Sequence, residues 1–411
     1  MNAMKKLLGW VDDRFPLIET WKLHLSEYYA PKNFNFWYFF GGLALFVLVI
    51  QIVSGIFLTM NYKPDALFAF ASVEYIMRDV QWGWLLRYMH STGASLFFVV
   101  VYLHMFRGMM YGSYRQPREL LWIIGMIIYL ALMAEAFMGY LLPWGQMSYW
   151  GAQVIVNLFA TVPYVGNDLS TLIRGDFVIS DITLNRFFAL HVIAVPLLLV
   201  AIVFVHLVAL HAVGSNNPDG IEIKKNKGAD GHPLDGIPFF PYMVAKDGVA
   251  TVAFLIVFSA VLFFAPEMGG YFIEANNFVP ANPMKTPLHI APVWYFTPYY
   301  AILRAVPPMF GSQFPGVVAM GVATMIFFAL PWLDRGKVKS IRYRGPIYKA
   351  FLAAFVVSFL GLGLLGTLPS TPTYTNIARV LSVVYFAFFI LMPWYTKIDK
   401  CKPEPDRLTS K

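Results

Sequence analysis

The chain has 411 residues, of which 58% are apolar and only 13% are charged, against roughly a quarter charged in an average soluble protein. A single soluble core stops growing at about 250–300 residues and could not bury this much apolar surface. The one cysteine, Cys401, excludes an intrachain disulfide, a cysteine-ligated zinc or iron–sulfur site and a thioether-attached haem. The composition therefore predicts an all-α integral membrane protein whose metal chemistry depends on its eight histidines.

Eight windows are apolar enough to span a bilayer as helices, which takes about 20 residues each. An even number of spans places both termini on one side of the membrane. In chain order the predicted spans are 36–60, 84–106, 120–142, 187–212, 248–266, 316–333, 346–367 and 376–396.

The basic residues indicate the orientation. The segments on the side of the termini hold 23 of the 31 Lys and Arg residues, and the opposite side, which has formal net charge zero, holds 8. This bias follows the positive-inside rule, so both termini are expected in the cytoplasm. The inside segments are 1–35, 107–119, 213–247, 334–349 and 397–411.

The spans and charges predict five parts. They are an amphipathic cytoplasmic segment (1–35), a four-helix bundle (36–215), a cytoplasmic connection (216–247), a C-terminal transmembrane part (248–398) and a cytoplasmic tail (399–411).

Two further segments need a separate interpretation. The outside segments 143–186 and 267–300 are too long for simple hairpins, and long structured loops are usually functional. The basic cluster 335–344 is interpreted as an inside anchor, and no nucleic-acid partner is expected.

Four histidines have matched spacing on two spans. His90 and His104 are 14 positions apart in the second span, and His191 and His206 are 15 apart in the fourth. On a helix, 14 residues give about 21 Å of rise and a rotation of only about −40°, so each pair shares one face. Two such helices can clamp two metals, one above the other, and the donors suit bis-imidazole haem iron. Four histidines that only bond neighbouring helices remain the alternative.

Four glycines repeat the same interval. Gly41 and Gly55 lie in the first span, and Gly125 and Gly139 lie in the third, 14 positions apart in each case. We interpret them as places where a neighbouring helix loses its side chain to let a haem edge approach. Close packing by small residues is the competing interpretation.

Two arginines lie beside the histidines. Arg87 is one turn before His90, and Arg107 is three residues after His104. Each could pair with the propionates of a haem at its own level, or could extend its charged end to the membrane surface.

With these residues in context, the chain resembles cytochrome b of the cytochrome bc complex (quinol–cytochrome c reductase, complex III). The most specific strings are LPWGQMSYWGA within 139–158 and HAVGSNNP at the end of 186–218, together with RYMHSTGASLFFVVVYLHMFRGMMYGSY at 87–114. The resemblance covers almost the whole chain. It implies two non-covalent haems b, with His90 and His191 on an outer low-potential haem and His104 and His206 on an inner high-potential haem.

The resemblance also implies a Q cycle, in which quinol is oxidised outside with electron bifurcation and quinone is reduced inside. One electron would go to a Rieske iron–sulfur protein and a cytochrome c1-type subunit, and the other would cross through the two haems, with net proton translocation. The outer site would include Tyr140, Trp150, Gly151, Pro292, Val293, Trp294, Tyr295 and Tyr300. The inner site would include His211, Ser215, Lys246 and Asp247.

Val293 departs from the family pattern, which commonly reads PEWY where this chain reads PVWY. The missing glutamate is the residue proposed in the family to bond quinol and carry a proton away. Because an acid inside a membrane span is a functional candidate, we expect Glu135 to take over this role at the outer site. Glu267 and Glu274 in the outside loop are its rivals.

The interval between His191 and His206 is a second departure, since most respiratory members have 14 residues there and the split chloroplast type has 15. A kink at Pro196 could absorb the extra residue. The unsplit chain, with no targeting segment, indicates a bacterial plasma membrane, and a homodimeric complex with bound lipid is expected from the resemblance.

Two other functions are alternatives to the cytochrome b interpretation. A di-haem membrane anchor of a dehydrogenase would have the histidine pairs but no outer docking loops. A histidine-lined transporter would show internal repeats and broken helices, and spans five to eight carry no histidine pair.

Overall fold

The structure is a computed structural model that describes residues 2–309 and 311–409, so the first residue of the predicted N-terminal segment and the last two of the 399–411 tail lie outside it. All eight predicted spans are confirmed as helices of sufficient length and apolarity. They run Phe36–Thr59, Gly83–Tyr111, Glu119–Leu141, Asp181–Val213, Phe239–Phe264, Phe314–Leu333, Pro346–Thr367 and Pro372–Ile390.

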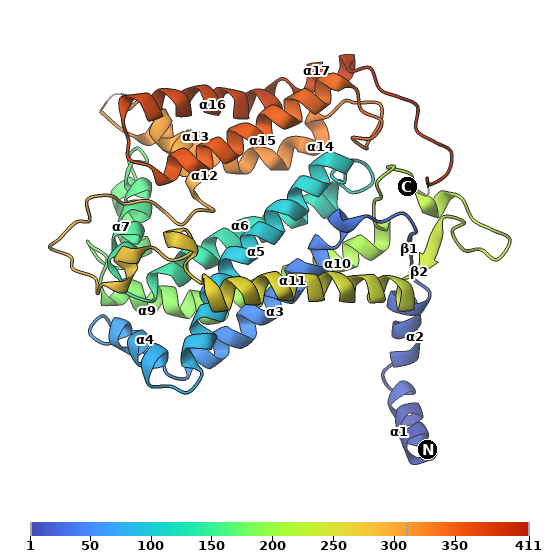
Figure 1. The fold of residues 1–411 in the computed structure, drawn as a ribbon, viewed down its shortest axis with the longest axis horizontal. Coiled ribbons are helices and arrows are strands. Elements are labelled where there is room, and N and C mark those ends of the chain that lie inside the picture. Colours follow the sequence, from blue (N-terminus) through green and yellow to red (C-terminus); the bar gives the residue numbers. More distant parts are fainter. Residues whose placement is uncertain (1, 310, 410–411) are drawn as a thin grey trace.

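The first four spans form the bundle at the middle of the molecule (Figure 1). Its long helices are α3 (Phe40–Thr59), α5 (Gly83–Tyr111), α6 (Glu119–Leu141) and α10 (Val195–Val213). Within the bundle, α3 packs along α5 and α6 packs along α10. Each glycine-bearing helix therefore lies against a histidine-bearing helix.

The fourth span contains a π-helical turn, η3 (Leu190–Ala194), between α9 (Asp181–Ala189) and α10. A π turn bonds i to i+5 and accommodates one extra residue, often at a functional site. His191 lies in this turn. The turn, and not a kink at Pro196 alone, therefore absorbs the fifteenth residue between His191 and His206.

The long segments after the first and third spans and between the fifth and sixth gather at one end of the molecule, the left side of Figure 1. They carry short helices because each contains turns at Pro and Gly and has no continuous apolar stretch. The helices there are α4 (Ala69–Arg78), α7 (Gln146–Ala160), α8 (Gly166–Arg174), η6 (Met268–Gly270) and η7 (Ala275–Phe278).

The C-terminal spans form a separate layer over the bundle, apart from α11, which packs on α5 and α3 (Figure 1). A buried aromatic cluster joins the layer to the bundle, since Tyr295 and Tyr299 pack in one core with Phe98 and Tyr129. The helices are α11 (Val244–Phe264), α12 (Thr297–Ala305), α13 (Phe314–Met325), η8 (Ile326–Ala329), α14 (Leu330–Leu333), α15 (Pro346–Thr367), α16 (Pro372–Ile390) and α17 (Met392–Ile398).

The N-terminal segment, the connection after the fourth span and the C-terminal tail meet at the opposite end, on the right of Figure 1. A two-stranded antiparallel sheet pairs β1 (Tyr29–Pro31) with β2 (Gly236–Pro238). Asp235 binds Lys32 at 2.8 Å and Arg407 at 2.6 Å. These neighbouring cations hold the pKa of the Asp235 carboxyl well below its usual range. The remaining elements here are α1 (Asn2–Asp12), α2 (Leu17–Trp21), η1 (Lys22–Ser26), η2 (Phe36–Tyr38), η4 (Ile223–Lys225) and η5 (Phe239–Met243).

The fifth span begins earlier than the sequence predicts. It starts at Phe239, because η5 runs directly into α11, and not at residue 248. Lys246 and Asp247 therefore lie in the first turn of α11 and not in a loop before it.

Candidate functional site

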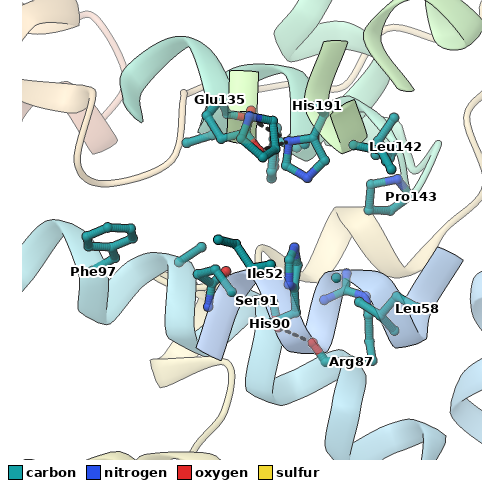
Figure 2. A pocket seen from close by; sticks show the side chains of 18 of the residues that line it. Ile52, Leu58, Arg87, His90, Ser91, Phe97, Glu135, Leu142, Pro143 and His191 are labelled. Atoms are coloured by element: carbon teal, nitrogen blue, oxygen red, sulfur yellow. Dashed lines mark hydrogen bonds and ion pairs between the residues drawn. The ribbon is translucent and has the colours of Figure 1, made fainter. Parts of the chain in front are cut away.

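The outer histidine pair faces across a cavity inside the bundle. His90 extends from α5 and His191 from η3, with ring centroids 6.1 Å apart and ring planes at 87° (Figure 2). The Nδ1 atom of His90 lies 3.0 Å from Ser54 Oγ. The Nδ1 atom of His191 lies 2.9 Å from the backbone oxygen of Glu135 and 3.0 Å from its Oε1. Both imidazoles thus use Nδ1 for the protein, which leaves Nε2 available for a metal.

Each of the four glycines packs against one of the four histidines. A Cβ added at Gly55 would lie 3.2 Å from His90, and one added at Gly139 would lie 2.3 Å from His191. The corresponding distances are 3.1 Å from Gly41 to His104 and 3.2 Å from Gly125 to His206. The glycines therefore make room for the imidazoles, and the expectation that they also clear space for a haem edge stays a prediction.

The inner pair has a different environment. The Nη2 atom of Arg107 lies 3.4 Å from His104 Nδ1. The Nδ1 atom of His206 is buried and has no hydrogen-bond partner among the described residues. Arg107 also bonds Ser113 Oγ at 3.0 Å and lies over the Tyr38 ring. A guanidinium, and no carboxylate, accompanies this pair.

Arg87 lines the same cavity as the outer histidines. Its guanidinium forms no hydrogen bond or ion pair within residues 2–309 and 311–409, and it lies one helical turn from His90 (Figure 2). A half-buried, unpaired cation beside facing imidazoles fits a group that brings its own carboxylates.

The outer cavity has a volume of about 420 Å³. Its wall includes His90, His191, Gly55 and Gly139 from the bundle. It also includes four side chains toward the outer loops, namely Tyr140, Phe272, Val293 and Tyr295. One space therefore connects the facing histidines with the PVWY segment.

These residues fit a haem. Two facing imidazoles with free Nε2 atoms, glycine-seated rings and an unpaired arginine supply axial ligands and a propionate partner. Among the described residues there is no cluster of three or more His, Cys, Asp or Glu that could hold a metal ion by itself. A ligand that brings its own equatorial donors, as porphyrin does, suits such a two-ligand site.

The comparisons with known proteins agree. The family models described as "Cytochrome b/b6/petB" and "Cytochrome b(C-terminal)/b6/petD" match residues 25–214 and 280–386. The cytochrome b of Allochromatium vinosum is 67% identical over 415 residues, covering all of both chains. The chain belongs to the cytochrome b family of the cytochrome bc complexes. Cytochromes b of this family carry b-type haem and take part in quinol oxidation and electron transfer.

Two further relatives extend the likeness. The cytochrome b/c1 of Bradyrhizobium diazoefficiens is 45% identical over 403 residues, covering 98% of this chain and 56% of that protein. A solved chain titled "Hyperthermophilic respiratory Complex III" superposes with a TM-score of 0.87 at 40% identity, covering 95% of this chain and 99% of that chain. This cytochrome b is a multi-pass membrane protein with eight apolar helices, consistent with a bacterial inner membrane.

The predicted outer-site residues divide into two groups. Tyr140, Val293 and Tyr295 line the cavity, and Tyr295 stacks on Phe98 with centroids 3.9 Å apart. Gly151 faces Tyr140, since a Cβ there would lie 3.7 Å from the ring. The other four lie outside the cavity wall: Trp150 bonds Asn282, Trp294 bonds Ser95, Tyr300 bonds Ile290, and Pro292 precedes Val293.

The three candidate acids occupy different places. Glu135 contacts His191 and belongs to the histidine level of the cavity. Glu274 accepts a hydrogen bond of 2.6 Å from the Tyr140 hydroxyl. Burial raises the pKa of Glu274 to about 7, and the bond from Tyr140 opposes that rise. Burial, and then the nearby Glu274 carboxylate, raise the pKa of Tyr295. Neither Glu274 nor Glu267 lines the cavity itself, and Glu274 reaches the cavity wall through its bond to Tyr140.

The predicted inner-site residues are only partly brought together. His211 stacks on Tyr28 with centroids 4.5 Å apart, and Ser215 Oγ lies 3.5 Å from the Tyr28 hydroxyl. Lys246 is exposed and Asp247 is half-buried, and within the described part of the chain neither bonds His211.

His24, which the sequence interpretation did not select, does contact His211. The two Nδ1 atoms are 2.8 Å apart, and the rings are stacked with centroids 5.1 Å apart. No spacing rule could identify His24, because 187 residues separate the two histidines.

Proposed function

We propose that this chain is the catalytic, haem-carrying subunit of a quinol–cytochrome c reductase and operates a Q cycle. Quinol would be oxidised at the outer cavity, one electron leaving to an iron–sulfur partner and the other crossing through two haems b to quinone at the inner end. The observation that carries the proposal is that two glycine-seated histidine pairs lie at two levels of one bundle, and the outer pair shares its cavity with Tyr140, Val293 and Tyr295.

His90 and His191 would hold the outer haem, and His104 and His206 the inner one. When bound, these haems would carry single electrons between the two ends. Arg87 and Arg107 would bind the propionates at their own levels. About 21 Å of helix rise separates His90 from His104 along α5.

At the outer site, Glu274 is the best candidate for the acid that Val293 lacks. A quinol hydroxyl loses its proton as the ring is oxidised, so the site needs a base near the ring. Glu274 is bonded to Tyr140 on the cavity wall and has a pKa of about 7, close to the value at which a base works best near neutral pH. Its place agrees better with this role than that of Glu135, whose carboxyl faces an imidazole.

At the inner site, quinone reduction consumes two electrons and two protons. His211 and Asp247 would supply the protons, with Ser215 and Lys246 lining the entrance. His211 is the member of this set that contacts the N-terminal segment.

The partners would be a Rieske iron–sulfur protein and a cytochrome c1-type subunit. The Bradyrhizobium relative is named cytochrome b/c1, and the solved relative belongs to a respiratory complex III, which supports a c1-type partner and a multi-subunit complex. The complex would be a lipid-bound homodimer in the bacterial plasma membrane. Both termini lie toward the end of the molecule that carries the sheet (Figure 1), and both would lie in the cytoplasm.

The test uses the intact complex, purified from membranes. Quinol-driven reduction of cytochrome c should be blocked by stigmatellin-type inhibitors at the outer site and by antimycin-type inhibitors at the inner site. A complex that reduces quinone or is reduced by quinol without any inhibitor-sensitive reduction of cytochrome c would instead be a di-haem anchor of a dehydrogenase.

A further inference from the structure

Glu135 lies deep in α6, and its carboxyl group faces one histidine only. Its Oε1 atom is 3.0 Å from His191 Nδ1, while its other oxygen, Oε2, is buried and has no hydrogen-bond partner in the described chain (Figure 2). The proposed function assigns proton acceptance from quinol to Glu274. The contact between Glu135 and His191 therefore needs a different functional explanation.

A histidine that ligates through Nε2 carries its proton on Nδ1 and donates it to a neighbouring acceptor. In this chain His191 Nδ1–H donates to the Glu135 backbone oxygen at 2.9 Å, which fixes the tautomer and the ring orientation. The Glu135 Oε1 atom lies 3.0 Å from the same nitrogen, so an ionised carboxyl group there adds negative charge beside the ligand. Negative charge beside the ligand stabilises ferric iron over ferrous iron and lowers the reduction potential of that iron.

We propose that Glu135 is a positioning residue that holds His191 and lowers the reduction potential of the outer haem. The inference rests on the proposed function, since it needs a haem between His90 and His191. A lower potential at the outer haem would favour electron transfer from the outer haem to the inner haem.

The other three histidines support the assignment by contrast. His90 has a neutral partner, the Ser54 hydroxyl at 3.0 Å. His104 has a cation beside it, the Arg107 guanidinium at 3.4 Å. His206 has no partner at Nδ1 in the described residues. The group that contacts a histidine nitrogen is a carboxyl group at the outer level, where Arg87 lies on the cavity wall without such a contact, and a guanidinium at the inner level.

The experiment is a potentiometric titration of the haems in the intact complex carrying Glu135→Gln, which keeps an oxygen acceptor but removes the charge. The lower of the two midpoints should rise by about 59 mV, a tenfold change in the one-electron equilibrium constant. The higher midpoint should stay unchanged. Glu135→Asp should restore most of the wild-type value, and Ser54→Ala is the matched control at the opposite ligand and should move the midpoint much less.

An unchanged lower midpoint in Glu135→Gln overturns the proposal, as does a Glu135→Asp complex that behaves like the neutral variant. If Glu135→Gln fails to assemble, Glu135→Ala decides: its lower midpoint should rise as well, and a wild-type midpoint in that variant overturns the proposal. The proposed function fails separately if the wild-type complex shows no pair of b-type midpoints.

The contact between His24 and His211 carries a second, independent inference. We infer that His24 reloads His211 with protons at the inner site, which also rests on the proposed function. His24, half-buried in η1 and protonated on both nitrogens, would give its Nδ1 proton to His211 Nδ1 while His211 passes its Nε2 proton to a quinone oxygen, forming an O–H bond. His211 would then regain a proton at Nε2 from water, and the shared proton would return to His24 Nδ1 before the second transfer. The two electrons come from the haems, and Lys224, bonded to the His211 carbonyl at 3.2 Å, is the nearby cation.

The test is quinol-driven reduction of the inner haem in complex whose outer site is blocked by a stigmatellin-type inhibitor. His24→Ala should slow it about a hundredfold, and added imidazole should restore it. His24→Phe keeps the stacking, should be equally slow and should not be rescued, while Lys22→Ala on the same turn is the control. A wild-type rate in His24→Phe overturns the inference, and no haem reduction in the wild type counts instead against the inner site itself.

Discussion

The outer and inner levels of the bundle are built on one plan and differ in charge. At both levels two imidazoles lie against glycines of the neighbouring helices, 14 positions apart on α3 and α6. At the outer level a carboxyl group contacts a histidine, and at the inner level a guanidinium does. Under the proposed function, the repeated plan would let the same cofactor bind twice, and the different groups beside the histidines would give the two copies different potentials.

The outer cavity also reaches the PVWY segment, whereas the residues proposed for the inner quinone lie beyond the histidines, around His211 at the end of α10.

The largest expected effect comes from removing one proposed haem ligand at each level. His191→Ala should lose the outer haem and keep the inner one, because the inner ligands lie about four turns away along the same two spans. His206→Ala should do the reverse. Haem content and low-temperature spectra of the purified complex measure this, and loss of both haems in both variants would show that the levels are not independent.

Glu274→Gln should reduce quinol turnover about a hundredfold, as expected for loss of a general base. The sign of the pH effect follows from the raised pKa: the carboxyl group must be deprotonated to take a proton, so wild-type turnover should rise with pH through about 7. The variant should lose that rise. Steady-state rates across pH test it, with Glu267→Gln in the same loop as the control. A wild-type pH profile in Glu274→Gln would return the role to another acid.

The glycines that contact the histidines should differ in how well they tolerate substitution by alanine. Gly139→Ala places a Cβ 2.3 Å from His191, whereas Gly125→Ala places one 3.2 Å from His206. Overpacking of this kind costs about 1–3 kcal/mol, so Gly139→Ala should weaken retention of the outer haem more than Gly125→Ala weakens retention of the inner one. Haem loss during detergent titration measures the difference. Equal loss in both variants would contradict the distances.

The smallest effect is expected at the entrance to the inner site. Lys246 is exposed on α11 and is not bonded to His211 in the described residues, so Lys246→Ala should leave turnover near the wild-type value. Asp247→Asn, one residue further along and half-buried, should have the larger effect. A severe defect in Lys246→Ala, measured as antimycin-sensitive turnover, would mean that quinone binding draws this lysine into the site.

The sequence predicted the spans and the histidine pairs because both follow one-dimensional rules. A bilayer sets the length of an apolar segment, and a helix converts 14 residues into a shared face, so His90, His104 and the glycines could be placed by counting. The interval of 15 residues at His191 also gave a real signal. Its physical cause, the π turn η3, became apparent only from the backbone.

Contacts between segments far apart in the sequence could not be predicted from residue spacing. Glu274 meets Tyr140, 134 positions away, and His24 meets His211 across 187 positions. Such pairs depend on how the loops fold back over the bundle ends. Glu135 illustrates the limit: the sequence identified it as a buried acid, but only the structure shows that an imidazole, and not the quinol loop, lies within 3.0 Å of it.

The central claim is that the bundle holds two haems with different reduction potentials. Its most direct test is a potentiometric titration of the wild-type complex beside the His191→Ala complex. We expect two one-electron b-type components in the wild type and loss of the lower-potential one alone in the variant. A single component in the wild type, or loss of the higher-potential component in His191→Ala, would contradict the account.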